Sequence, residues 1–260
     1  MPAYRHGRHE HGQNFLDDRR IVSSIISLVA ATNGPIIEIG PGGGALTLPL
    51  ARLGRPVTAV EIDPALADNL RTKVDPAIAT IVTGDFLRHR LQSTPHVIVG
   101  NLPFHLTTAI LRHLLHAPGW TDAFLLTQWE VARRRAAVGG ATMMTAQWWP
   151  WFTFALHGRV PAAAFTPRPN VDGGLLAIHR RDVPLLDARR KSRYKRFVHG
   201  VFTGRGRGLA EITARSTGAP LSDVRAFLRS RQIPRGTLPK DLGPEDWVAM
   251  FNRFGNPGGR

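Results

Sequence analysis

Short apolar runs alternate with amphipathic stretches along residues 1–181 of the chain. The apolar runs predict strands at 35–39, 55–63, 78–85, 96–101, 121–128, 151–158 and 174–180. Apolar residues at helical spacing predict helices over 17–31, 107–117 and 129–137, with Asp17 as the cap of the first. Because strands that alternate with helices build βαβ units, we expect an α/β fold with a mostly parallel, Rossmann-like sheet.

The pattern changes near Asp182. Strand-like runs stop there, basic residues crowd together, and helical spacing returns near 190–203, 221–230 and 244–254. We therefore expect a main α/β domain over residues 1–181 and a small all-helical domain over residues 182–260.

Residues 1–13 are polar and rich in His and Arg, which predicts a flexible basic arm. Metal-binding side chains occur in it at His6, His9, Glu10 and His11. A metal site normally needs a closed set of about four ligands, and no further ones are evident, so we expect none here.

The charge balance favours a polyanionic partner. Lys and Arg number 34 against 19 acidic residues, which gives a net charge of +15. Such a surplus attracts nucleic acid over long range, although a basic protein without an anionic partner is the alternative. The chain has no Cys, and we see neither a membrane-spanning run nor a signal-peptide pattern. We expect a cytoplasmic protein that does not bind membranes.

A glycine-rich turn follows the first strand and opens a helix, where open α/β sheets bind ligands. The glycines alternate, at Gly40, Gly42 and Gly44, and Glu38 lies two residues before the first. This spacing differs from the G-x-G-x-x-G pattern of dinucleotide-binding oxidoreductases. Gly40 and Gly42 allow close approach of a ligand, and a carboxylate at 38 suits a ligand with a cationic end better than a pyrophosphate.

Acidic residues also end the next two predicted strands. Glu61 is placed to accept both hydroxyls of a ribose, whereas Asp63 is better explained as the cap of a helix that begins at Pro64. Asp85 is placed to accept a hydrogen bond from an adenine amine, and Phe86 to lie against the ring. Each acid alone could be a helix cap, but three at successive strand ends indicate one nucleoside site.

The fourth strand ends in Asn101-Leu102-Pro103-Phe104. The amide oxygen of Asn101 and the main-chain carbonyl of Leu102 could accept the two N–H groups of an exocyclic amine, which would free its lone pair. Pro103 would stiffen the turn, and Phe104 would stack on the base. An ordinary strand-to-helix turn with a buried Phe is the alternative.

Seven segments of the chain, taken together and in order, resemble the motifs of the rRNA adenine N6-methyltransferases, which include the Erm macrolide-resistance enzymes and the KsgA-type dimethylases. These segments are QNFL (13–16), EIGPGGGALT (38–47), VEID (60–63), GDFL (84–87), NLPF (101–104), TQWEVARR (127–134) and FTPRPNVDGG (165–174). The resemblance covers about residues 8–181 and implies a catalytic domain over 1–181 that binds S-adenosylmethionine and releases S-adenosylhomocysteine. It implies no metal. It also adds Asn14, Leu16 and Ile62 to the cofactor site, and Phe165 as a second aromatic wall for the flipped adenine.

The details are most similar to Erm enzymes. The lead-in GRHEHGQNFL, the stretch TQWEVAR and AQWWPW (146–151) resemble Erm proteins of actinomycete type. This implies a monomer that methylates one adenine in domain V of protein-free or precursor 23S rRNA and confers macrolide-lincosamide-streptogramin B resistance. Phe104 departs from the family, where Tyr is common. A KsgA-like 16S rRNA dimethyltransferase and a non-catalytic RNA-binding factor are the alternatives.

Two basic clusters are candidate contacts to RNA phosphates, although each is also readable as a solvated helix face. They contain Arg133, Arg134 and Arg135, and Arg189, Arg190, Lys191, Arg193, Lys195 and Arg196. Trp148, Trp149 and Trp151 could form a platform for bases, but we favour a core or domain-junction cluster.

Overall fold

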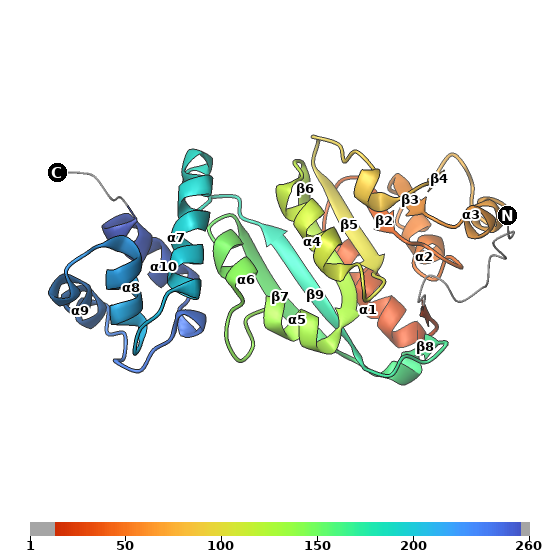
Figure 1. Ribbon diagram of the computed structural model, residues 1–260. Helices are drawn as coiled ribbons and strands as arrows, with labels where there is room; N and C mark the ends of the chain where they lie inside the picture. The colour runs from red at the N-terminus through yellow and green to blue at the C-terminus, as the bar shows by residue number, and fades with distance from the viewer. Residues whose placement is uncertain (1–13, 256–260) are drawn as a thin grey trace, which may run out of the picture. The chain divides into compact units, whose positions relative to one another are not determined.

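The computed structural model describes residues 14–255, so the predicted basic arm and the histidines in it lie outside the described residues. Its main feature is a seven-stranded sheet with the order β4-β3-β2-β5-β6-β9-β7 (Figure 1). The strands are β2 (Ile36–Ile39), β3 (Val57–Glu61), β4 (Ala79–Thr83), β5 (His96–Asn101), β6 (Trp120–Gln128), β7 (Phe152–Val160) and β9 (Gly173–Arg180). Strands β2 to β6 pair in parallel, and β9 runs antiparallel to β6. The predicted Rossmann-like α/β fold is confirmed.

The helices between these strands are α1 (Arg19–Ala30), α2 (Thr47–Ala51), α3 (Pro64–Arg71), α4 (Thr107–His116) and α5 (Trp129–Arg135). As predicted, Asp63 caps α3, since its carboxylate accepts from two main-chain N–H groups of the first turn. The prediction for α1 was wrong by one residue, because Asp18 and not Asp17 caps it. The main chain of Asp17 instead donates to the carbonyl of Ala164, which delays the helix start. No helix within 14–255 is long and apolar enough to cross a membrane.

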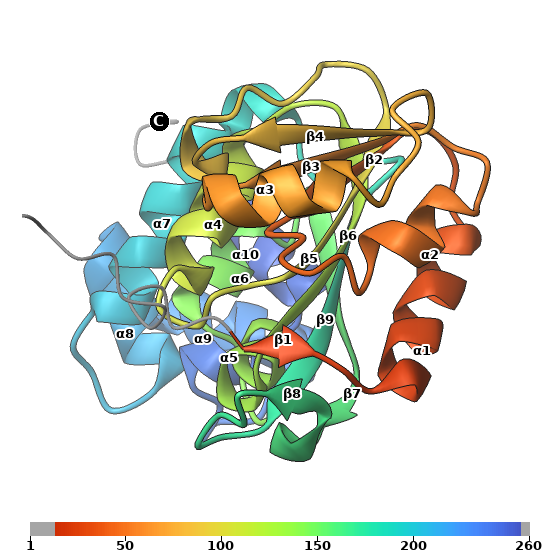
Figure 2. The ribbon, with the colours of Figure 1, turned by 90° about the vertical axis from the view of Figure 1, so that its right-hand side faces the viewer.

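A second, two-stranded sheet joins segments that lie far apart in the sequence. Strand β1 (Phe15–Leu16) pairs antiparallel with β8 (Phe165–Thr166), as Figure 2 shows. The short 3-10 helix η2 (Ala162–Ala164) precedes β8 and provides the carbonyl to which Asp17 is bonded. The sheet therefore holds the start of the described chain beside the loop that follows β7.

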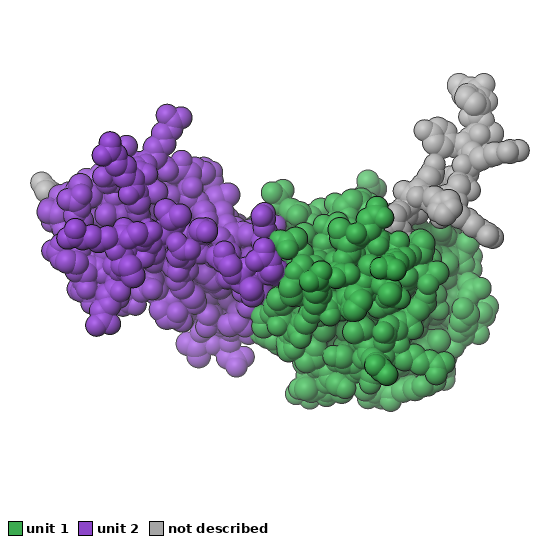
Figure 3. Space-filling model, turned by 90° about the horizontal axis from the view of Figure 1, so that it is seen from below, with its two compact units in different colours: residues 1–132, 155–179 green, residues 133–154, 180–260 purple. Residues whose placement is uncertain are grey.

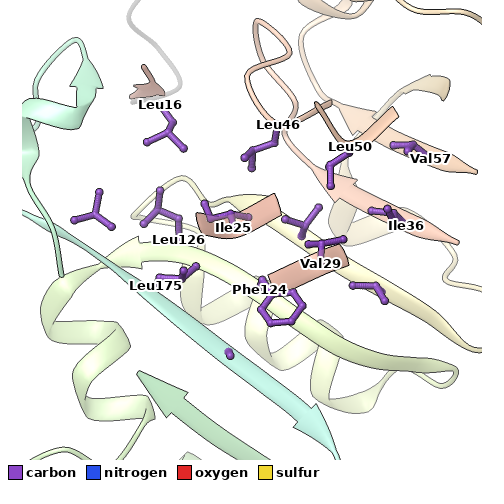
Figure 4. Packing of buried hydrophobic residues seen from close by; sticks show 14 of the residues in the cluster. Leu16, Ile25, Val29, Ile36, Leu46, Leu50, Val57, Phe124, Leu126 and Leu175 are labelled. Carbon is purple, nitrogen blue, oxygen red and sulfur yellow. The ribbon is translucent and has the colours of Figure 1, made fainter. Parts of the chain in front are cut away.

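Apolar side chains between α1 and one face of the sheet form the core of this part of the protein. Ile25 and Val29 of α1 contact apolar side chains from the central strands, among them Ile36 and Phe124 (Figure 4). Parallel strands covered on both faces consist almost wholly of buried apolar residues, which explains why uninterrupted apolar runs predicted them. Leu16 of β1 belongs to the same cluster, so the small sheet is packed onto the large one.

The chain divides into two compact units, coloured separately in Figure 3. The second combines Arg133–Phe154 with Arg180–Arg260 and contains α6 (Met143–Trp148), α7 (Lys191–Thr203), α8 (Leu209–Thr217), α9 (Leu221–Ser230) and α10 (Pro244–Phe254). The predicted division at 181/182 is therefore incomplete, because it left residues 133–154 in the first domain. They belong to the second unit because Tyr194 of α7 donates to the carbonyl of Ala146 (2.9 Å) and packs edge-on against Trp151.

The guanidinium of Arg55 fixes the carboxyl end of α1. It donates to the carbonyl of Val29 (2.9 Å) in the last turn of the helix, which Thr32 also donates to, and to the carbonyls of Thr32 (3.0 Å) and Gly34 (2.6 Å) in the turn that follows. Replacement by Met should lower the free energy of unfolding by about 2 kcal/mol, since several carbonyls lose a charged donor. Urea denaturation measures this, with the exposed Arg52→Met as control; equal stability of the two variants would contradict the assigned role.

Candidate active site

A cavity of about 970 Å³ opens at the carboxyl ends of β2, β3 and β5. Its wall brings together the residue types expected from the sequence: the glycine-rich turn, two acids, the NLPF segment and the start of the described chain. The predicted site residues on this wall are Asn14, Leu16, Glu38, Gly40, Gly42, Glu61, Asn101, Leu102, Pro103 and Phe104. All of them belong to the first compact unit.

The turn after β2 has a backbone that only glycine adopts easily. Gly42 has φ +53°, and a Cβ at this position would lie 2.8 Å from the ring of Phe15. Its N–H donates to Oε2 of Glu61 at 2.9 Å. The missing side chain thus lets the turn approach both the strand end of β3 and the segment of β1.

Two buried carboxyl groups face the cavity from neighbouring strands. Glu61 accepts from the N–H of Gly42 and from that of Asp63 (3.0 Å), so each of its oxygens is held by one main-chain donor and retains further acceptor capacity. Glu38 accepts from Oγ1 of Thr47 at 2.6 Å. Burial raises the pKa of Glu38 to about 8, the Thr47 hydrogen bond opposes this rise, and the charge of Glu61 adds to it. A cationic group in the cavity beside Glu38 would therefore favour the ionised form of this carboxyl.

The amide of Asn101 is oriented by the N-terminal segment. Its Nδ2 donates to the main-chain carbonyl of Asn14 at 2.7 Å, so its oxygen is the end left to accept hydrogen bonds in the cavity. The N–H of Leu102 donates to the carbonyl of Leu126 at 2.8 Å, and its side chain is buried. No donor among residues 14–255 contacts the Leu102 carbonyl. Two fixed acceptors, one neutral amide and one main-chain oxygen, thus follow each other at the end of β5.

The structure does not bring three predicted cofactor residues to the cavity wall. Asp85 accepts from the N–H of Leu87 and caps the 3-10 helix η1 (Phe86–Arg88). Phe86 is buried against the rings of His89 and His113. Ile62 is half exposed beside Glu61. Their assignment to the cofactor stays a prediction.

Phe165 is part of the hydrophobic core in this structure, and its assignment as a second aromatic wall for the adenine stays a prediction. It is 3% exposed and packs with Leu16 and Leu126 in the main cluster. A Cβ on Gly173 would lie 3.2 Å from its ring, which shows how closely the backbone of β9 approaches it. The next residue, Thr166, lines the cavity instead, because successive side chains of a strand point to opposite faces.

Two polar residues of the site were missed in the sequence. Thr47 is the hydrogen-bond partner of Glu38, and Thr166 lies on the cavity wall. Thr47 ends the EIGPGGGALT segment, so its place in the motif was an available signal. Thr166 could have been found from the alternation along β8, had the pairing of that strand with β1 been known.

The arginines of α5 differ in their surroundings. Arg133 donates to the carbonyl of Val138 and Arg135 to Oγ1 of Thr142, so both take part in holding the turn after the helix. Arg134 is exposed. Of the three, Arg134 is thus the side chain most open to RNA.

The basic side chains just before and within α7 also differ in their surroundings. Arg190 donates to Oδ1 of Asn252 and Arg193 to the carbonyl of Gly255, both at the end of α10. Arg189 is exposed. Lys191 lies over two tryptophan rings of the second unit. Burial confirms the core interpretation of Trp148, Trp149 and Trp151.

Metal ligands do not gather anywhere in the described chain. No group of three or more His, Asp or Glu side chains within residues 14–255 is arranged to hold an ion.

The chain is similar to known proteins over most of its length. The family model described as ribosomal RNA adenine dimethylase matches residues 5–256. An rRNA adenine N-6-methyltransferase of Corynebacterium diphtheriae is 62% identical over 83% of this chain and 85% of its own length. The mycinamicin-resistance protein MyrB of Micromonospora griseorubida is 44% identical over 98% of this chain and 81% of its own. The crystal structure of the 23S rRNA methyltransferase ErmE superposes with a TM-score of 0.85 at 34% identity and covers 94% of this chain and 100% of that one.

The raised pKa of Glu38 predicts how stability depends on pH. An unfolded Glu ionises near pH 4.5, whereas the folded protein keeps this proton to about pH 8, so stability falls as the pH rises between these values. Glu38→Gln removes this dependence. Between pH 5 and 8, urea denaturation without added ligand should show the wild type losing on the order of 3 kcal/mol relative to the variant. Parallel stability curves would contradict a buried neutral carboxyl.

Proposed function

This chain belongs to the ribosomal RNA adenine dimethylase family, and from that premise we propose that it methylates the exocyclic N6 of one adenine in 23S rRNA. We place the target in domain V, at the macrolide site. The likeness to the 23S enzyme ErmE and to a mycinamicin-resistance protein supports this target over one in 16S rRNA. Methylation there would block the drug site and confer macrolide-lincosamide-streptogramin B resistance.

The residues of the cavity fit S-adenosylmethionine as the methyl donor. When bound, it supplies a methyl group on a positively charged sulfur, which is already activated toward displacement. The carboxyl of Glu38 would hold its ammonium group, and this favours the ionised form of a side chain whose pKa burial raises. Glu61, with its oxygens held by main-chain N–H groups, would accept from the ribose hydroxyls. The absence of side chains at Gly40 and Gly42 allows close approach of the ligand to the turn.

The observation that carries the proposal is the pair of acceptors at the end of β5. The lone pair of an adenine amine is delocalised into the ring, which makes the nitrogen a poor nucleophile. Oδ1 of Asn101 and the carbonyl of Leu102 would each accept one N–H and draw the nitrogen toward tetrahedral geometry. Neither acceptor is charged, so neither needs to lose a proton. The protein's contribution is therefore positioning of the amine.

Phe104 provides a ring for the target base. It lies on the cavity wall just after Asn101, at the approach to α4. An adenine has to leave its stack to reach such a cavity, and stacking on an aromatic side chain offsets part of the cost, by about 1–3 kcal/mol per base. The exposed Arg134 and Arg189 stay proposed contacts to the RNA backbone.

The target is tested by transfer of a labelled methyl group. Protein-free 23S rRNA should accept label, and primer extension should stop at one adenine of domain V. The same assay on 16S rRNA in immature small subunits serves as the comparison. Labelling of 16S and not of 23S rRNA would overturn the proposed target and select a KsgA-like function.

The amide of Asn101 is tested by two substitutions. Asn101→Ala removes an acceptor, and we expect at least a 100-fold loss of kcat. Asn101→Asp should be almost as inactive, because a carboxylate cannot donate to the Asn14 carbonyl and is repelled by it. Cofactor affinity, measured by calorimetry, checks that the site is intact. Near-normal kcat in Asn101→Asp would show that the orientation of the amide does not matter.

The ring of Phe104 is tested by a matched pair. Phe104→Tyr keeps the stacking surface and should retain activity, whereas Phe104→Leu should raise KM for RNA roughly 5- to 100-fold, as expected when one base no longer stacks. Equal KM values for the two variants would exclude base stacking at this position.

A further inference from the structure

The basic side chains at the start of α7 lie in two different environments. Arg190 and Arg193 are bonded to the end of α10, as described above. Lys191 and Lys195 are one helical turn apart and therefore share the opposite side of the helix. Both are partly buried, and both lie over indole rings.

These two lysines and Arg180 form what we call the cationic cluster. The ammonium of Lys191 is 5.2 Å from the ring centres of both Trp148 and Trp151, and that of Lys195 is 4.3 Å from the centre of Trp148. At the end of β9, the guanidinium of Arg180 is 4.8 Å from the ring centre of Phe152, which in turn packs edge-on against Trp148. The three cations thus lie over one continuous group of aromatic rings in the second unit, those of Trp148, Trp151 and Phe152, which we call the aromatic floor.

The floor cannot itself bind bases. Trp148 and Trp151 are 2% and 4% exposed, so their faces are covered, in part by the ammonium groups of the lysines. Long cationic side chains commonly cover apolar surface with their stems and keep the charged ends at the solvent side. The groups that the cluster offers to a ligand are consequently the ammonium and guanidinium ends.

The cations disfavour one another. Burial lowers the pKa of Lys191, and the charge of Arg180 lowers it further. Burial likewise lowers the pKa of Lys195, with an added contribution from the charge of Lys191. No hydrogen bond or ion pair joins the Lys191 ammonium to a described residue. An anion placed among the three would relieve this repulsion and gain from their partial burial.

We propose that Arg180, Lys191 and Lys195 together bind a backbone phosphate of the RNA substrate. This proposal rests on the proposed function and specifies which basic residues contact the RNA. Among the basic residues of α7, Lys191 and Lys195 bind the phosphate, together with Arg180 at the end of β9. Arg190 and Arg193 instead hold the end of α10. The aromatic floor holds the lysine ammonium groups in place, so the cations already have the position needed to bind a phosphate before RNA binds.

The test is the salt dependence of RNA binding by the full chain. Each phosphate that the protein no longer neutralises lowers the slope of log K against log salt by about 0.7–0.9. The double variant Lys191→Met, Lys195→Met keeps apolar stems over the indoles and removes both charges. With a protein-free domain V fragment of 23S rRNA as the probe, we expect the slope of this variant to be about 0.8 smaller than that of the wild type, because one phosphate contact is lost. Lys191→Arg with Lys195→Arg should restore most of it.

The matched control is the double variant Arg225→Met, Arg229→Met. It removes the same net charge from exposed positions on α9 of the same unit, and its slope should stay close to that of the wild type. An unchanged slope in the lysine variant, or equal decreases in both variants, would overturn the proposal. If the lysine variant is unstable in thermal denaturation, Lys195→Met alone should still lower the slope, by less than the about 0.8 of a whole phosphate contact.

The two proposals fail in different ways. Absence of methyl transfer to any 23S fragment contradicts the proposed function, whereas the salt slope reports on phosphate contacts whether or not the fragment is methylated. If domain V is methylated but the lysine variant and the wild type have equal slopes, phosphate binding by the cationic cluster is excluded and the proposed function stands.

Discussion

One hydrogen bond determines which end of the Asn101 amide faces the cavity: its Nδ2 donates to the main-chain carbonyl of Asn14. An amide can present either its donor or its acceptor end, and only the acceptor end suits an adenine amine. The Asn14 carbonyl resolves this choice, because it can only accept. It is held in place by the pairing of β1 with β8, which packs on the main core through Leu16. The orientation of one side chain therefore depends on a contact between two widely separated segments of the chain.

The rest of the site follows from the convergence of parallel strands. The carboxyl ends of β2, β3 and β5 meet at one edge of the sheet and bring Glu38, Glu61 and Asn101 to one cavity. Burial raises the pKa of the Glu38 carboxyl, and a cationic partner would favour its ionised form, whereas the amide of Asn101 needs no change of protonation. In the proposed reaction the protein positions groups beside an already activated methyl donor, and no strong base is required.

Much of this could be predicted from the sequence, because buried parallel strands leave continuous apolar runs and the residues after them converge by topology. Local patterns failed where a long-range contact decides. The core position of Phe165 depends on the register between β8 and β1, and the inclusion of residues 133–154 in the second unit depends on contacts with Tyr194. Short helices also escaped prediction: α6 has only 6 residues, and α8 has 9, two of them Thr, with Gly on both sides. The place of Arg180 over Phe152 had no sequence signal.

The central claim is tested most directly by a crystal structure of the protein with S-adenosylhomocysteine and an RNA hairpin that carries the target adenine. The account predicts that Oδ1 of Asn101 and the carbonyl of Leu102 both lie about 3 Å from the N6 atom of the extruded base. It also predicts that Nδ2 stays bonded to Asn14. An N6 held by other groups, or an Asn101 amide turned with Nδ2 toward the base, would contradict it.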